Sequence, residues 1–194
     1  MCLTDVSGHG VRPALLSVSA HNLIRSGSLS LPTLLKPDRV LNELNGLFQM
    51  DDQADSYFTI WYGVYQRSTR TLRYASAGHP PALALNRDSD GGIAATALAT
   101  PAYPIGMFAD TVFTADAYRV PNGGQLLLYS DGAYELPLDD ERRSRFSLDN
   151  FVSLCTELAV RPGWSLDDLV NRLRLCSPTG DFDDDCALVL LTFP

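Results

Sequence analysis

Lysine is nearly absent from this sequence, since Lys36 is the only one among 194 residues. Lysine and arginine together number 15 against 23 aspartates and glutamates, which gives a formal net charge of -8. Proteins that bind nucleic acid or anionic membrane surfaces rely on clustered basic side chains. We therefore expect neither nucleic acid nor a membrane among the partners of this protein.

Several sequence signatures are also missing. The longest apolar runs have about the length of a strand, and no signal-peptide pattern follows Met1. The four cysteines form no C-x-x-C pair, so we expect no zinc site and a reducing, cytoplasmic setting. The sequence lacks both the Gly-x-Ser-x-Gly of α/β-hydrolases and the phosphate-binding loop of P-loop enzymes. Its 45% hydrophobic content is that of one ordinary globular domain, predicted over residues 1–194.

Hydrophobic periodicity predicts helices and strands in separate blocks. Apolar residues three or four apart predict helices at 11–24, 37–50, 151–160 and 166–175. The apolar stripe of the first helix is expected to comprise Leu15, Leu16, Val18, Leu23 and Ile24. Apolar and β-branched runs predict strands at 57–65, 71–77, 82–85, 111–120, 125–129 and 186–193. Helices, a strand meander, helices and a final strand favour an α+β fold with antiparallel sheets.

Acidic residues occur in three loops that each adjoin a strand-like run. Asp5 lies in Asp5-Val6-Ser7-Gly8-His9-Gly10, Asp131 follows the run 125–129, and Asp183-Asp184-Asp185 precedes the last strand. No lysine or arginine stands beside them, so their mutual repulsion favours a hard cation. This indicates Mg²⁺ or Mn²⁺ chemistry on an oxyanion such as phosphate. Taken alone, each loop also has a plain structural explanation, as a turn with a capping or solvated acidic residue.

In combination and order, the motifs resemble those of bacterial PP2C-type serine/threonine phosphatases of the SpoIIE/RsbU branch. The matching segments are the Asp5 motif, Ser76-Ala77-Gly78-His79-Pro80-Pro81, Tyr103-Pro104-Ile105-Gly106-Met107-Phe108, Leu127-Leu128-Tyr129-Ser130-Asp131-Gly132 and Asp183-Asp184-Asp185-Cys186-Ala187-Leu188. The resemblance implies a four-layer α-β-β-α sandwich of two antiparallel sheets. It also implies a phosphorylated STAS-domain protein as substrate, and it leaves room for an upstream sensor or receiver domain.

The resemblance further implies a site with two Mn²⁺ or Mg²⁺ ions. Asp5 would bridge the ions, the Val6 carbonyl would bind one of them, and Asp131 and Asp184 would be further ligands. Asp183 is the next choice if the register of the acidic run is shifted by one residue. A metal-held water would attack the phosphorus of phosphoserine or phosphothreonine, with no covalent intermediate.

The sequence departs from the family pattern in two places. The family has strands and a Gly-Gly-Asp segment before the first motif, whereas Met1 lies four residues before Asp5. We therefore expect a fold without its N-terminal strands. A second hypothesis is a catalytically weakened or inactive module that acts as a binding partner. Ala187 stands where the family commonly has a hydroxyl residue.

The three histidines carry separate expectations. His9 is either a proton donor to the leaving oxygen or a loop-packing residue. His79 is expected to brace a turn, and His21 is expected to be structural.

Overall fold

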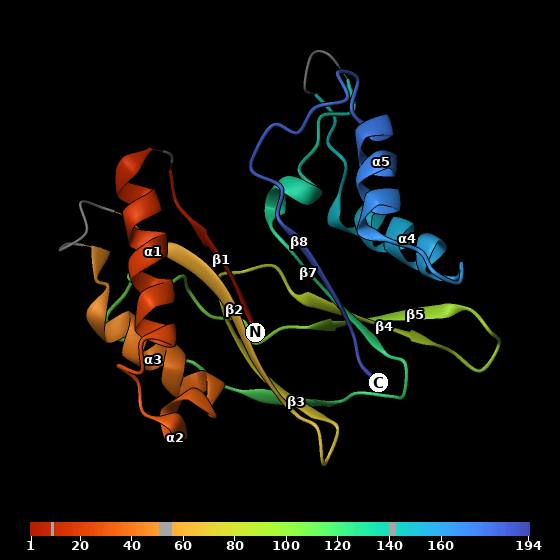
Figure 1. The fold of residues 1–194 in the computed structure, drawn as a ribbon. Helices are drawn as coiled ribbons and strands as arrows, with labels where there is room; N and C mark the ends of the chain where they lie inside the picture. The colour runs from red at the N-terminus through yellow and green to blue at the C-terminus, as the bar shows by residue number, and fades with distance from the viewer. Residues whose placement is uncertain (9, 51–55, 140–142) are drawn as a thin grey trace. The chain divides into compact units, whose positions relative to one another are not determined.

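The computed structural model describes residues 1–8, 10–50, 56–139 and 143–194. These residues form two compact units (Figure 1). Unit 1 comprises Met1–Pro81 and Leu98–Val120, and unit 2 comprises Ala82–Ala97 and Pro121–Pro194. Among the described helices, none is long and apolar enough to cross a membrane.

Unit 1 contains a four-stranded sheet with the strand order β1-β2-β3-β6. The strands are β1 (Cys2–Val6), β2 (Phe58–Gln66), β3 (Thr71–Ala77) and β6 (Asp116–Arg119). All three neighbouring pairs are antiparallel. The alternating residues Phe58, Ile60 and Tyr62 of β2 join the core beneath the helices, because side chains two apart share one face of a strand.

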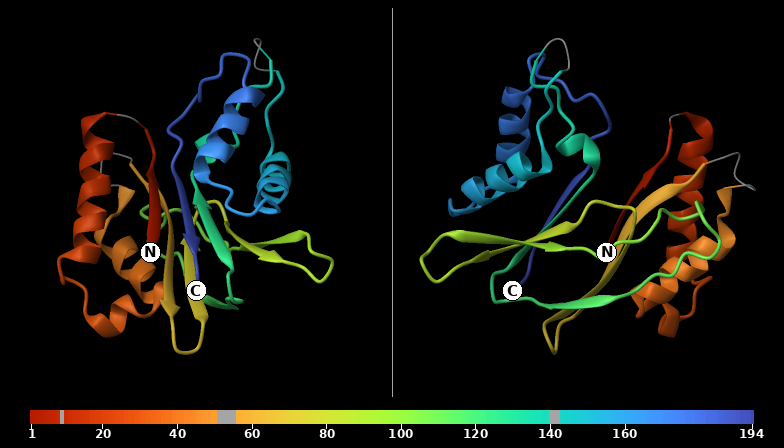
Figure 2. Two further views of the ribbon diagram at one scale, coloured as in Figure 1. Left: turned by 45° about the vertical axis from the view of Figure 1, so that its right-hand side comes forward. Right: turned by 180° about the vertical axis from the view of Figure 1, so that it is seen from behind.

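Helices α1 (Val11–Arg25), α2 (Leu31–Leu34) and α3 (Pro37–Leu47) contribute to the same core. Figures 1 and 2 show them on one side of the sheet of unit 1. Ser30 caps α2 by accepting a hydrogen bond from the Thr33 N–H. Pro37 occupies the first turn of α3, where its missing N–H costs nothing. Val40, Leu41 and Leu44 of α3 are fully buried.

The predicted apolar stripe of the first helix is only partly correct. Leu16 and Ala20 are buried, and Leu23 and Ile24 pack against them. Leu15 and Val18, however, are 60% and 55% exposed. Residues at 16, 20, 23 and 24 share one side of a helix, whereas 15 and 18 are rotated away from it. The helix is rich in apolar residues on more than one side, so the sequence pattern alone did not determine which side is buried.

Unit 2 contains a second four-stranded sheet with the order β5-β4-β7-β8. Its strands are β4 (Ala82–Arg87), β5 (Ile93–Leu98), β7 (Gln125–Tyr129) and β8 (Leu188–Thr192). Strand β7 pairs antiparallel with both β4 and β8. The short 3-10 turn η2 (Asp131–Ala133) follows β7 directly.

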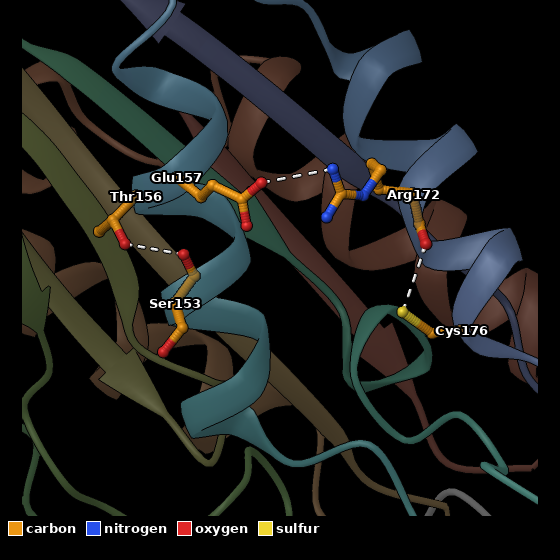
Figure 3. A network of polar contacts seen from close by, with 5 residues as sticks. All are labelled: Ser153, Thr156, Glu157, Arg172 and Cys176. Carbon is orange, nitrogen blue, oxygen red and sulfur yellow. Dashed lines mark hydrogen bonds and ion pairs between the residues drawn. The ribbon is translucent and has the colours of Figure 1, made fainter.

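Helices α4 (Leu148–Ala159) and α5 (Leu166–Cys176) cover the core of unit 2. Both begin with a capping box, formed by Ser147 with Asn150 and by Ser165 with Asp168. Figure 3 shows polar contacts of these two helices, including the ion pair of Glu157 on α4 with Arg172 on α5 at 3.3 Å. This pair is exposed and adds little stability compared with the apolar core.

The structure confirms the predicted α+β class with two antiparallel sheets. The largest error in extent is the expected strand 111–120, which is regular only at Asp116–Arg119. The chain before it turns at Phe108, whose carbonyl accepts hydrogen bonds from the backbone and the side chain of Thr111. The helix predicted at 37–50 ends at Leu47, and the strand predicted at 186–193 spans Leu188–Thr192. Elements β1, α2 and β5 were not predicted.

Candidate metal centre

The first acidic motif lies on the edge strand of unit 1. Asp5 pairs with Thr59 and Val6 pairs with Phe58 in the antiparallel ladder of β1 and β2. The Thr59 hydroxyl donates to the Asp5 carbonyl oxygen at 3.4 Å. Asp5 is half-buried, and the ladder fixes its backbone at the end of the sheet.

Ser7 continues this ladder by one residue, and its side-chain oxygen accepts a hydrogen bond that a backbone carbonyl would normally accept. The Ser7 N–H donates to the Tyr57 carbonyl at 3.0 Å, as in a regular antiparallel pair. The return bond from the Tyr57 N–H goes to Ser7 Oγ at 3.1 Å, and Ser7 Oγ donates to the Tyr57 carbonyl at 2.8 Å. Gly8 then turns the chain toward α1 with a φ of 84°. His9, for which two roles were expected, lies outside the described residues.

Ser130 forms a corresponding pair at the end of β7 in unit 2. Its N–H donates to the Ala187 carbonyl at 3.0 Å, and the Ala187 N–H donates to Ser130 Oγ at 2.9 Å. Ser130 Oγ also donates to the Asp185 carbonyl at 2.8 Å. The Ser130 carbonyl is thereby available to accept from the Ala133 N–H at 3.1 Å, the bond that forms η2.

Gly132 brings the two acidic segments of unit 2 into backbone contact. A Cβ at this position would lie 2.6 Å from the Asp185 carbonyl oxygen and 3.1 Å from the Asp184 carbonyl oxygen. Only a residue without a side chain permits this approach. Unit 2 therefore places Asp131 beside the acidic run, although 53 positions in the chain separate it from Asp184.

The Asp131 carboxylate fits a cation. Its Oδ1 atom is buried, and no hydrogen-bond donor reaches it among the described residues. A buried carboxylate oxygen normally has a partner, and a bound cation supplies one. Asp184 is exposed, and its Oδ1 accepts the Asp185 N–H at 2.7 Å. Carboxylate oxygens of this kind suit Mg²⁺ or Mn²⁺.

The field around Asp131 is negative. Burial, followed by the charges of Asp131 and Glu135, raises the pKa of Tyr134 to about 12. The segments 130–132 and 181–187 contain five aspartates and no lysine or arginine. Unit 2 thus offers a negatively charged surface to a cation.

The predicted site residues are divided between the units. Asp131 and Asp184 belong to unit 2, whereas Asp5 and Val6 belong to unit 1. Within either unit, the described residues contain no group of three or more His, Cys, Asp or Glu side chains that could hold a metal ion. His79 is buried, and its Nδ1 donates to the Pro80 carbonyl at 2.9 Å, as expected for a residue that braces a turn.

Asn45 is a residue of unit 1 that the sequence did not single out. It is 3% exposed, and its Oδ1 accepts the Gly106 N–H at 2.8 Å while its Nδ2 donates to the Phe108 carbonyl at 3.0 Å. These bonds attach the loop that carries Gly106 to α3. Ser7 and Ser130 were likewise missed as structural residues, although both stand within predicted motifs.

Comparison with known proteins identifies the family. The family model of Stage II sporulation protein E (SpoIIE) matches residues 1–194. The phosphoserine phosphatase RsbP of Bacillus subtilis (strain 168) is 36% identical over 137 residues, which make up 69% of this chain and 32% of RsbP. The chain thus spans about a third of the length of this relative.

Solved structures agree on the fold. The SiaA-PP2C domain of Pseudomonas aeruginosa matches all of this chain and 74% of that domain, with a TM-score of 0.77 and 19% identity. RsbX, solved in complex with magnesium, matches 97% of this chain and 78% of that chain, with a TM-score of 0.60 and 14% identity. The family model covers the whole chain, and the fold is that of the PP2C domain of SiaA. This protein therefore belongs to the SpoIIE family.

Proposed function

We propose that this chain is a metal-dependent protein phosphatase that hydrolyses phosphoserine or phosphothreonine on a regulatory protein. The observation that carries the proposal is the buried Oδ1 of Asp131, which has no donor among the described residues and lies in a segment joined to the acidic run at Asp184. Membership of a serine phosphatase family supplies the reaction class. The related fold of RsbX was solved with magnesium, which supports a divalent cation here.

The proposed ligands are Asp5, the Val6 carbonyl, Asp131 and Asp184, which would hold two Mn²⁺ or Mg²⁺ ions. Such ions, when bound, lower the pKa of a water and neutralise charge that develops on the phosphoryl oxygens. The aspartates supply the negative charge that retains the ions. The two serine-containing ladder ends keep the acidic segments in fixed backbone positions.

The proposed substrate is a phosphorylated STAS-domain protein, as the family resemblance implies. The chain would act as the phosphatase part of a regulatory protein with an upstream sensor or receiver domain. The match to about a third of RsbP supports this arrangement, because most of that relative lies outside the matched segment.

The test is hydrolysis of p-nitrophenyl phosphate and of a phosphoserine peptide with Mn²⁺, with Mg²⁺ and with chelator. We expect turnover that requires the metal and stops on chelation. Asp131→Asn should lower kcat/KM by at least about 100-fold, because it removes a charged ligand. Asp149→Asn on α4 is the matched control, since it removes an aspartate charge from the first turn of a helix in the same unit. Absence of any metal-dependent turnover would overturn the proposal.

The second candidate is a weakened or inactive PP2C-fold module that binds a regulatory protein. One observation favours it, namely that neither unit by itself gathers three potential metal-binding side chains among its described residues. This candidate predicts binding of a phosphoserine peptide that is unchanged by chelator, together with no turnover. Turnover with Mn²⁺ would exclude it.

A further inference from the structure

We infer that Ser130 is a positioning residue for the Asp131 carboxylate. Its side-chain hydroxyl accepts the hydrogen bond from the neighbouring strand that its backbone carbonyl would otherwise accept. The inference rests on the proposed metal site and adds a residue that does not itself bind the ion. It starts from the last regular pair of β7 and β8, which is Tyr129 with Leu188. One residue further on, Ser130 meets Ala187.

In a regular antiparallel pair, each residue both donates its N–H and accepts with its carbonyl. Ser130 keeps the donor half, with its N–H 3.0 Å from the Ala187 carbonyl oxygen. The side chain of Ser130, not its carbonyl, acts as the acceptor, because Oγ accepts a hydrogen bond from the Ala187 N–H at 2.9 Å. The ladder is therefore closed without the Ser130 carbonyl.

The released carbonyl has a second function. It accepts the Ala133 N–H at 3.1 Å and so begins the η2 turn that contains Asp131. Without a side-chain acceptor at position 130, the Ala187 N–H could be satisfied only by the Ser130 carbonyl, which is already oriented toward the Ala133 N–H of the turn. Either the Ala187 N–H would lose its partner or the turn would open, and in both cases Asp131 would move.

The same hydroxyl fixes the opposite acidic segment. Ser130 Oγ donates to the Asp185 carbonyl at 2.8 Å, and Ser130 is only 3% exposed. Its donor and acceptor capacities are thus both used, one on each side of Cys186. Because Asp184 precedes Asp185 directly, the distance between the Asp131 and Asp184 backbones depends on this hydroxyl.

The test compares Mn²⁺ binding by isothermal calorimetry for the complete chain and four variants. Ser130→Ala should weaken Mn²⁺ affinity roughly 10–100-fold, the usual range for residues that orient metal ligands. Ser130→Thr retains the hydroxyl and should restore affinity to within about threefold of the wild type. Ser130→Cys nearly preserves the volume but supplies a weak acceptor, so it should resemble alanine and serves if alanine fails to fold.

The matched control is Ser153→Ala on α4, which also removes a hydroxyl that donates to a carbonyl at 2.8 Å in unit 2. Its Mn²⁺ affinity should equal that of the wild type. Hydrogen exchange of the Ala187 amide gives a readout without metal, since it should accelerate in Ser130→Ala and stay slow in Ser130→Thr. If Ser130→Ala and Ser130→Cys both fold and bind Mn²⁺ as tightly as the wild type, the inference about Ser130 is overturned, whereas the proposed metal site is not. No Mn²⁺ binding by the wild type would overturn the proposed metal site as well.

Discussion

The two units end a ladder in the same way but use the closing serine differently. Ser7 in unit 1 and Ser130 in unit 2 each donate a backbone N–H to the neighbouring strand and accept the return N–H with Oγ. Ser7 Oγ then donates back to the same neighbour, Tyr57. Ser130 Oγ donates instead to Asp185, two residues before its neighbour.

This difference separates two structural tasks. The hydroxyl of Ser7 strengthens one connection between an acidic strand and β2. The hydroxyl of Ser130 connects two acidic segments that are distant in sequence. The same side chain therefore stabilises a strand end in unit 1 and sets the spacing of candidate ligands in unit 2.

The largest expected effect comes from Gly132, which lies in the junction of unit 2. In Gly132→Ala the new Cβ would meet the backbone at Asp185, 2.6 Å from its carbonyl oxygen, so the segments must separate. We expect a loss of about 3 kcal/mol in unfolding free energy, at the upper end for overpacking. Chemical denaturation measures the loss, and calorimetry should show much weaker Mn²⁺ binding.

The matched change in unit 1 is Gly8→Ala. Gly8 has a positive φ of 84°, but a Cβ there would meet only the Pro13 side chain at 3.9 Å. The cost is then conformational alone, roughly 1 kcal/mol. Equal losses for the two glycines would contradict the claim that steric contact distinguishes the units.

The next effect in size is that of Ser7→Ala. It removes both side-chain hydrogen bonds to Tyr57 and should lower unfolding free energy by about 1–2 kcal/mol. Mn²⁺ affinity should fall less than in Ser130→Ala, because only one acidic segment is released. Ser7→Thr is the control that keeps the hydroxyl. A larger loss of Mn²⁺ affinity from Ser7→Ala than from Ser130→Ala would contradict the conclusion that Ser130, and not Ser7, sets the spacing of the candidate ligands.

The elements around these junctions were largely predictable from sequence, because they follow local patterns. The strands at 71–77 and 125–129 were predicted with the bounds that the structure has. Strand β1 was missed because Cys2–Val6 is short and lacks a regular apolar alternation. The strand predicted from 111 was too long, since Thr111 belongs to a turn closed by its N–H on the Phe108 carbonyl. The Asn45 side chain also donates to that carbonyl from 63 residues away, a contact that no local pattern indicates.

The candidate site was predictable in its residue types but not in its contacts. The aspartates stood out by their position beside strands. The pairing of Ser130 with Ala187 spans 57 residues, so no local pattern indicates it. The same holds for the approach of Gly132 to Asp185. A glycine is needed at position 132 because the Asp185 backbone lies so close, and not because of its own backbone conformation.

Two buried tyrosines should respond to loss of their hydroxyls in opposite directions. Tyr62 in unit 1 donates to the Leu34 carbonyl at 3.0 Å, so Tyr62→Phe should lose about 1 kcal/mol of unfolding free energy. The hydroxyl of Tyr129 in unit 2 is buried without a hydrogen-bond partner among the described residues. Tyr129→Phe should therefore be neutral or gain up to about 1 kcal/mol. Chemical denaturation of both variants measures the two changes in unfolding free energy. A clear loss in Tyr129→Phe would contradict the statement that the Tyr129 hydroxyl has no hydrogen-bond partner in the described part of the chain.

The smallest expected effect concerns tyrosine ionisation. The pKa of Tyr74 in unit 1 and that of Tyr134 in unit 2 are both raised to about 12, in each case mainly by burial and then by an aspartate. Asp116 also accepts a hydrogen bond from the Tyr74 hydroxyl at 3.3 Å, whereas Asp131 acts on Tyr134 through its charge. A raised pKa means that each folded tyrosine keeps its proton where the unfolded one has lost it. Its stabilising contribution is thus complete below about pH 10 and is lost as the pH rises toward 12.

Asp116→Asn should lower the pKa of Tyr74 more than Asp131→Asn lowers that of Tyr134, because only the first change alters a hydrogen bond as well as a charge. Both decreases should be smaller than the total shift, since burial is the largest cause and remains. Carbon-13 NMR titration of the tyrosine rings measures each value separately. Glu135→Gln is the control, with a smaller decrease at Tyr134 because Glu135 is the least of its causes. An unchanged pKa of Tyr134 in Asp131→Asn would mean that the Asp131 charge is already neutralised in solution, as a retained cation would do.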